Sequence, residues 1–161
     1  MEGSGRPFEL TVPVTLHPAL ASLRGSEGEV WLTVAPVHQP MVEVRGLLGR
    51  RKREAARWCI AVQDWSRSGA PTELTLWLQL PPGPRLTQRD VSLPPGAVAE
   101  VDDSTDALVR LPHGTEPEVA AVEVCRLAAE LIAPHAPGGF FWRVADTATP
   151  QYDPSVRSVG G

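Results

Sequence analysis

The chain of 161 residues contains no asparagine, one lysine, two cysteines and one tyrosine. It has no apolar run near the roughly 20 residues that a membrane-spanning helix needs. Its first residues lack the charged-then-apolar order of a signal peptide. Both cysteines, Cys59 and Cys125, fall inside predicted regular elements, which favours buried free thiols over a disulfide. We therefore expect an intracellular protein, cytoplasmic or nuclear.

Catalytic and metal-binding motifs are also absent from the sequence. It contains no H-E-x-x-H, no paired C-x-x-C, no Gly-rich phosphate loop and no G-x-S-x-G. The four histidines share no ligand-like spacing, and Asp64 has no visible partner for acid–base work. Asp102, Asp103 and Asp106 could offer oxygens to a divalent cation, but a hairpin turn prefers the same residue type. We expect no enzyme, no catalytic residues, no metal and no cofactor.

The composition that is present fits a folded domain. Hydrophobic residues make up 42% of the chain and charged residues 21%, which is typical of globular proteins. The 17 prolines and 14 glycines favour short elements joined by many turns. We predict one globular domain over residues 1–145 and a flexible tail over residues 146–161.

Apolar and polar residues alternate along much of the chain, which predicts about seven short strands. Residues 57–65 and 72–80 form the clearest hairpin, and residues 97–101 and 107–111 form a second. Residues 8–16 are predicted as an edge strand, because Pro13 lies on the polar face. Further strands are expected at 30–35 and 41–48, and residues 91–93 and 138–146 are candidates for additional ones.

The spacing becomes helical at Glu116 and predicts one long helix over residues 116–133, which Pro134 ends. Thr115 and Glu118 match a capping box. Apolar residues cover most of the circumference of this helix, so it should pack on a broad sheet. The predicted fold is a β-rich α+β domain, a small antiparallel barrel or sandwich of six to eight strands with this helix packed on it.

Positive charge is concentrated in one segment. Residues 45–57 hold six basic residues and one acid, a local sum of +5 that leaves −9 on the rest of a chain with net charge −4. The basic tetrad, Arg50 to Arg53, is expected at a hairpin tip or in a connecting loop. It could orient the molecule on an anionic partner, act as a nuclear-import cluster, or simply be a solvated loop.

The tryptophans are the second candidate surface. Trp31 and Trp77 are predicted on the sheet face opposite the aliphatic rows, whereas Trp58 shares a face with Ile60 and Val62. Large aromatic residues on an otherwise polar face belong either to a binding surface or to a core beneath the helix.

Two family resemblances follow from this region. VEVRGLLGRRKREAARWCIAVQDWS, followed by TELTLWL, resembles the start of an oligonucleotide-binding barrel. That resemblance implies a binder of single-stranded nucleic acid, with basic residues on phosphates and a tryptophan stacked on bases. GLLGRRKREAARW also resembles the basic loop of a pleckstrin-homology-like domain, which implies anionic-lipid or peptide binding and a barrel capped by residues 116–133. The candidate binding residues are Arg50, Arg51, Lys52, Arg53, Arg57, Trp58 and Trp77.

The leading hypothesis is a non-catalytic adaptor module that acts through protein–protein contact. Its partner would be another subunit of a larger complex or a second copy of the chain. An edge strand at 8–16 could accept a partner strand, and pairing with another subunit would explain the very apolar helix. Single-stranded nucleic acid and anionic lipid are the alternative partners of the basic segment.

Overall fold

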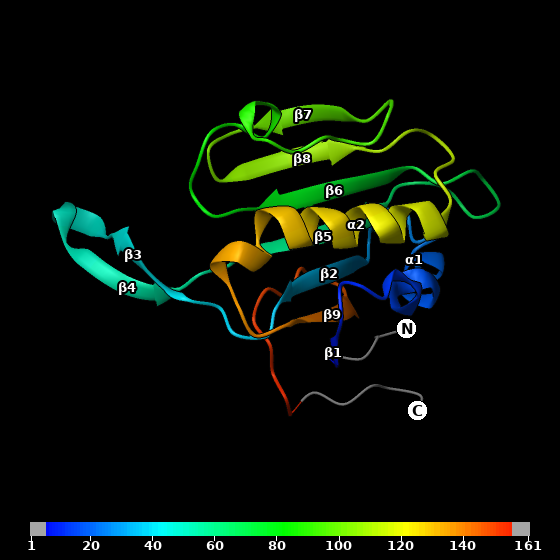
Figure 1. The fold of residues 1–161 in the computed structure, drawn as a ribbon. Coiled ribbons are helices and arrows are strands. Elements are labelled where there is room, and N and C mark those ends of the chain that lie inside the picture. Colours follow the sequence, from blue (N-terminus) through cyan, green and yellow to red (C-terminus); the bar gives the residue numbers. More distant parts are fainter. Residues whose placement is uncertain (1–5, 156–161) are drawn as a thin grey trace.

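The computed structural model describes residues 6–155 and places a seven-stranded antiparallel sheet at the centre (Figure 1). The strands are β1 (Pro7–Phe8), β2 (Trp31–Pro36), β3 (Met41–Arg45), β4 (Arg51–Ala55), β5 (Cys59–Asp64), β6 (Leu74–Gln79), β7 (Val98–Asp102), β8 (Asp106–Arg110) and β9 (Phe140–Ala145). The helices are α1 (His17–Ser22) and α2 (Pro117–Leu131), with short 3-10 segments at Pro13–Leu16, Leu47–Gly49, Leu86–Gln88 and Ala133–His135.

The sheet runs in the order β1-β9-β2-β5-β6-β8-β7, and β3 and β4 form a separate two-stranded hairpin. The two predicted hairpins, β5–β6 and β7–β8, are confirmed by their antiparallel pairing. The last strand, β9, lies between β1 and β2, so the C-terminal part of the chain completes the sheet beside strands from its beginning.

The predicted β-rich α+β class with a long C-terminal helix is confirmed. The sheet stays open, however, and does not form the barrel that both family resemblances imply. Closure requires the two edge strands to pair with each other. Here one edge, β1, has two residues, and the other, β7, is interrupted by a register shift between Ala99 and Val101.

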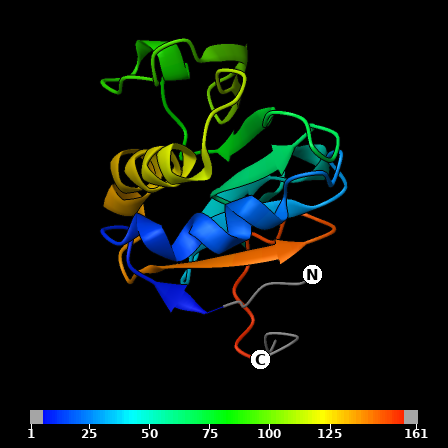
Figure 2. The same cartoon turned by 90° about the vertical axis from the view of Figure 1, so that its right-hand side faces the viewer.

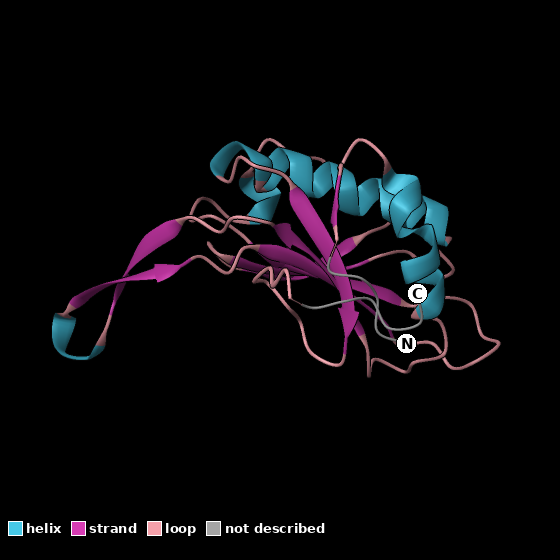
Figure 3. Cartoon of the chain, turned by 90° about the horizontal axis from the view of Figure 1, so that it is seen from below, coloured by secondary structure: helices cyan, strands magenta, loops and turns pink. Residues whose placement is uncertain are grey.

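One face of the sheet carries the main core. Figures 2 and 3 show α2 lying across this face, with α1 beside it. The strands supply alternate aliphatic residues and α2 supplies one face, on which seven of its residues are buried. The buried set includes Leu32, Val34, Ile60, Val62, Leu76, Leu78, Val109, Val124, Leu127 and Ala128.

The start of α2 differs from the predicted capping box. The N-cap is Glu116, no side chain caps the helix, and Pro117 occupies the first turn. The Thr115 hydroxyl instead donates to the carbonyl oxygen of Pro112 at 2.6 Å. Proline is well suited to this position because its missing N–H has no partner in the first helical turn anyway.

The prediction of an edge strand at residues 8–16 is wrong. Only Pro7 and Phe8 pair with β9, and the chain turns into a 3-10 segment and α1. Leu16, Leu20 and Leu23 are buried, and their spacing is that of one helix face. The segment thus carries both an alternating and a helical pattern. It adopts the helical one because the three leucines are then buried in the core beneath α2. The strand predicted at residues 91–93 is not formed either.

The C-terminal segment, from residue 146, lies against the other face of the sheet. The backbone N–H of Thr149 donates to Thr33 Oγ1 at 3.0 Å. The Tyr152 ring lies 5.2 Å from that of Phe141 between centroids, over a small core with Ala35 and Cys59. Residues 156–161 of the predicted tail lie outside the described residues. Within the described part, neither helix has both the length and the apolar character that crossing a bilayer requires.

Candidate functional site

Part of the sheet face opposite the helices is left open by the C-terminal segment, and three tryptophans gather there. Alternation along β2 and β6 directs Trp31 and Trp77 to this face, and Trp65 follows directly after β5. They surround a hollow of about 390 Å³. We call this site the tryptophan hollow, lined by Trp31, Gln63, Trp65, Thr75, Trp77, Glu100 and Leu108.

Hydrogen bonds hold the rings of the hollow in place. Trp65 Nε1 donates to Thr75 Oγ1 at 3.0 Å. Trp77 Nε1 lies 3.3 Å from the Gln79 amide oxygen when the amide nitrogen of Gln79 faces the carbonyl oxygen of Arg57. Gln63 on the floor is 7% exposed and donates to the carbonyl oxygen of Gly28 at 2.7 Å. The indole N–H groups of Trp65 and Trp77 are thus occupied inside the protein, while the Trp65 side chain remains half exposed.

One carboxylate stands at the rim of the hollow. Glu100 lies in the register shift of β7, where the chain bulges between Ala99 and Val101. A bulge redirects a side chain relative to the regular strand. Its Oε1 is 3.2 Å from Arg110 Nη2 on the neighbouring strand, so the rim carries an ion pair beside an aromatic surface.

The β3–β4 hairpin is the second distinctive surface. Residues 41–55 form an arm that projects from the end of the sheet (Figures 1 and 3). The basic tetrad was expected at a tip or in a loop, but Arg51, Lys52 and Arg53 lie on β4 and Arg50 just before it. The tip consists of residues 46–49, because Gly49 adopts a positive φ of +73° that a tight reversal needs.

The charges of the arm are only loosely neutralised. Arg51 lies 3.9 Å from Glu43, and Lys52 lies 3.4 Å from Glu54. All residues of β4 are exposed, and exposed pairs of this kind contribute little to stability. The arm is therefore a solvated basic surface whose charge remains available to a partner.

No protein-family model, curated protein or solved structure matches this chain.

The remaining predicted site residues do not form one surface. Arg57 follows the arm, and Trp58 packs toward the helix layer, edge-on to His135 with 6.2 Å between ring centroids. Trp77 lies on the opposite face of the sheet, in the hollow. Arg57 and Trp58 do share a depression of about 280 Å³ at the base of the arm, so the structure groups these two but separates both from Trp77.

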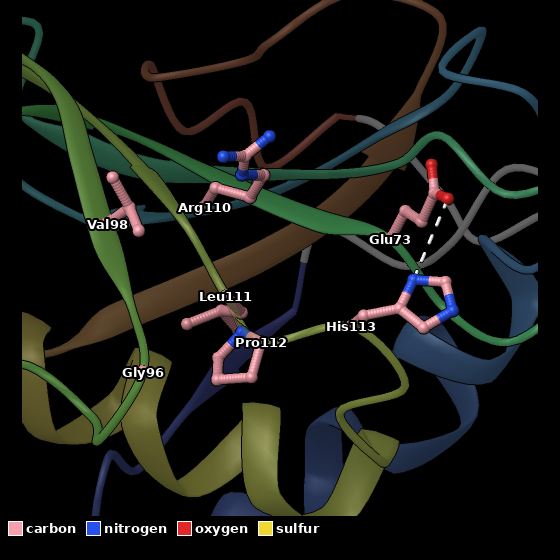
Figure 4. Close-up of a pocket in the computed structure, with 7 residues that line it drawn as sticks. All are labelled: Glu73, Gly96, Val98, Arg110, Leu111, Pro112 and His113. Carbon is pink, nitrogen blue, oxygen red and sulfur yellow. Dashed lines mark ion pairs between the residues drawn. The ribbon is translucent and has the colours of Figure 1, made fainter.

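A third depression, of about 330 Å³, lies beside β8 and contains a histidine–carboxylate pair (Figure 4). His113 Nδ1 is 3.7 Å from Glu73 Oε1, and both side chains are more than half exposed. The other lining residues are Gly96, Val98, Arg110, Leu111 and Pro112. None of the described lining residues has a hydroxyl or thiol that this pair could activate as a nucleophile.

Asp64 and Asp102, two of the carboxylates considered from the sequence, accept hydrogen bonds from nearby loops. The carboxylate of Asp64 is fully buried and accepts hydrogen bonds from the backbone of Ser66 and Glu73, at 2.9 and 3.1 Å. These bonds fix the loop between β5 and β6. Asp102 accepts from Thr87 and Leu86. Across residues 6–155 no group of three His, Cys, Asp or Glu side chains is placed to hold a metal ion.

Sequence reasoning missed three residues that define these surfaces. Trp65 ends the predicted strand 57–65, and continuing the alternation one step past Gln63 was the signal that could have placed it on this face. Leu47 and Leu48 lie between two glycines, and that G-L-L-G pattern between two strands was the available signal for the tip.

Proposed function

We propose that the chain is a non-catalytic protein-binding module that docks a segment of a partner protein on the tryptophan hollow. The observation that carries this proposal is the set of three indoles on an uncovered sheet face, two of which, Trp65 and Trp77, have their N–H groups bonded inside the protein. Fixed aromatic surfaces of this kind dominate the energetics of protein interfaces because they bury a large area at little entropic cost.

The chemistry of the hollow favours a partner segment that combines an apolar side chain with a positive charge. Trp31, Trp77 and Leu108 offer apolar contact, and indole faces attract cations. Glu100 adds a carboxylate at the rim. The chain outside residues 45–57 carries a charge of −9, which would draw a basic segment toward the body of the protein.

A non-catalytic role is supported by the histidine–carboxylate pair of Glu73 and His113, since no hydroxyl or thiol nucleophile stands among the described residues that line its depression. The two cysteines are free and buried. Free thiols suit a reducing compartment, so we propose an intracellular location.

Peptide display tests the proposal. A random-peptide library is panned on the chain and counter-selected on the variant Trp77→Thr, which keeps a strand-forming residue on β6. We expect enriched peptides with an aromatic or aliphatic residue near a lysine or arginine. Their affinity should fall at least about tenfold in Trp77→Thr, as for a central aromatic anchor. Val119→Ser, on the exposed side of α2, is the control and should bind normally.

Two results would contradict the proposal. One is a library from which no peptide separates the chain from Trp77→Thr, although circular dichroism shows that the variant is folded. The other is a set of peptides whose affinity depends on Arg50 to Arg53 and not on the hollow. Tight oligonucleotide binding that weakens steeply with salt would support the nucleic-acid alternative instead.

A further inference from the structure

The arm ends in two leucines that have almost no contact with the rest of the protein. Leu47 is 93% exposed and Leu48 is 97% exposed. Leu48 also adopts a φ of +65°, a left-handed conformation that is uncommon for residues other than glycine. Full exposure means that the two side chains gain no stability from burial. The backbone conformation of Leu48 costs folding free energy.

Basic side chains surround these leucines. Arg45 and Arg51 lie opposite each other at the outer end of the arm, and Arg50 follows the tip directly. The acidic residues of the arm, Glu43 and Glu54, lie further toward the body, opposite Arg53 and Val42. The arm is thus layered along its length: apolar at the extreme, cationic behind it, and mixed in charge at its base.

We propose that the arm inserts its leucine tip into an anionic lipid surface. Apolar residues at the extreme would enter the boundary between headgroups and acyl chains. The long arginine side chains behind them would remain at the headgroups, where guanidinium groups bind phosphate in bidentate fashion. The order of residues along the arm matches the order of layers in a membrane interface.

The shape of the tip favours a lipid surface over a protein. A stable protein interface buries about 800 Å² on each partner around a packed centre. The tip presents two exposed apolar side chains on a narrow, projecting hairpin (Figures 1 and 3). A fluid interface can close around such a projection, whereas a folded partner would need a groove made for it.

The length of the arm also explains how an acidic protein could approach an anionic surface. Its five-residue strands span roughly 16 Å at about 3.3 Å per residue. The screening length at physiological ionic strength is about 8 Å. The arm therefore holds the negatively charged body beyond the range of strong repulsion, while its own charges lie at the surface.

This inference does not depend on the proposed function of the hollow. The hollow lies on the sheet around β5 and β6, while the tip is at the far end of the arm. Either surface could work without the other, and they are tested with different variants and different probes.

Vesicle flotation tests the inference. The full chain is mixed with phosphatidylcholine vesicles, or with vesicles in which about a quarter of the lipid is phosphatidylserine. We expect retention on the anionic vesicles alone, lost as salt is raised. Leu47→Ser combined with Leu48→Ser should weaken retention at least about tenfold while the charge is unchanged. Val119→Ser combined with Val122→Ser removes two exposed apolar residues from α2 and should have no effect.

A second pair of variants tests whether the positive charge of the arm contributes to retention on the vesicles. Arg50→Ser combined with Arg51→Ser should weaken retention at least about tenfold. Arg67→Ser combined with Arg85→Ser removes the same charge from exposed positions outside the arm and should leave retention within about twofold, since charges away from the surface are screened.

Insertion itself is measured with a polarity-sensitive dye. The variant Leu48→Cys can be labelled selectively because both native thiols are buried. Its emission should shift to the blue on anionic vesicles, whereas a dye on Val119→Cys should not respond. Unchanged emission at residue 48 would overturn the inference even if the chain floats with the vesicles.

Three other results would also overturn it. The first is a chain that stays off anionic vesicles altogether at low salt. The second is retention that inorganic phosphate abolishes but the leucine variants leave unaffected, which would indicate a phosphate site only. The third is a change of oligomeric state in the leucine variants, measured by sedimentation without lipid, which would make the tip a protein interface.

Discussion

Trp65 packs directly against the backbone of Gly28. A Cβ atom added to Gly28 would lie 2.4 Å from Trp65 Cζ3, and Gly28 has a φ of +80°. The N–H of Gly28 also donates to the carbonyl oxygen of Asp64 at 2.8 Å. The loop before β2 therefore supports one wall of the tryptophan hollow, and it can do so only because this residue has no side chain.

Gly28→Ala should disturb this wall. We expect a loss of about 1 to 3 kcal/mol in the free energy of unfolding, from the clash and the positive φ together. Denaturant unfolding measures the loss. Gly69→Ala is the matched control, because Gly69 has a φ of +81° and no neighbour within 4 Å of an added Cβ. Equal losses in the two variants would show that Trp65 does not depend on Gly28.

The same pair of variants should separate in binding. Gly28→Ala displaces Trp65. It should therefore weaken the binding of any peptide selected on the hollow, because the peptide contacts the wall that Trp65 forms. Gly69→Ala should leave peptide affinity unchanged. Titration of the selected peptide into each variant measures both.

Local patterning was sufficient for elements whose pairing partners are close in sequence. Leu74, Leu76 and Leu78 alternate without interruption, and their partners on β5 are one turn away, so the hairpin and its faces followed from periodicity. The long helix was predicted for the same reason. Periodicity was insufficient at Leu16, where an alternating pattern and a helical pattern overlap and only burial beneath α2 selects one.

The candidate surfaces depended on contacts that no local pattern contains. Trp65 joins the hollow through Thr75, ten residues later, and through Gly28, far earlier in the chain. The basic tetrad was expected at a hairpin tip or in a connecting loop because it lies between two predicted strands. Three of its residues, Arg51 to Arg53, instead occupy a strand that pairs with β3 away from the main sheet. Every residue of this strand is exposed, so a run of cations is tolerated there.

Burial protects both thiols. Burial raises the pKa of Cys59 to about 12; the nearby Arg57 lowers this pKa and Asp106 raises it further. Burial also raises the pKa of Cys125, to about 11. Because the thiolate is the reactive form, a disulfide reagent at mildly alkaline pH should leave the native chain unmodified. In denaturant both thiols should react.

The variant Leu48→Cys is the positive control for this measurement, since its thiol is on the exposed tip and should react at once in the native state. Rapid modification of the unaltered native chain would contradict the burial of Cys59 and Cys125.

Asp102 should make the free energy of unfolding depend on pH in the acidic range. Partial burial raises its pKa, but hydrogen bonds from the side chain and backbone of Thr87, and from the backbone of Leu86, outweigh burial and leave the pKa below the ordinary value of 3.8. A carboxylate with a lowered folded-state pKa stabilises the protein fully above its unfolded-state pKa. That contribution is lost as pH falls through the folded-state pKa.

Asp102→Asn should therefore lower the free energy of unfolding by about 1 to 2 kcal/mol at neutral pH, because charge-assisted hydrogen bonds are replaced by neutral ones. The difference from the unaltered chain should shrink below pH 3.8. Urea unfolding at both pH values measures it. Asp103→Asn, on the exposed neighbour, is the control, and an equal effect of the two substitutions would refute the role of Asp102.

Tyr152 should hold the C-terminal segment on the sheet. Its ring packs against Phe141, and the neighbouring Gln151 donates to the carbonyl oxygen of Ala56 at 2.8 Å. Removing the ring should expose the small core that includes Cys59. We expect Tyr152→Ala to cost about 2 to 4 kcal/mol of unfolding free energy, within the range for large aromatic truncations at a partly buried site.

The two cysteines report separately on the two faces of the sheet, because Cys59 lies under the C-terminal segment and Cys125 lies on the helix side. In Tyr152→Ala the thiol of Cys59 should become reactive in the native state, because its cover is loosened. Cys125 should stay protected, since it is buried in α2 on the helix side of the sheet. Thr147→Ala, at an exposed position of the same segment, should leave both thiols unreactive. If Cys59 remains protected in Tyr152→Ala, or if both thiols react together, the segment does not cover this face as a separate unit.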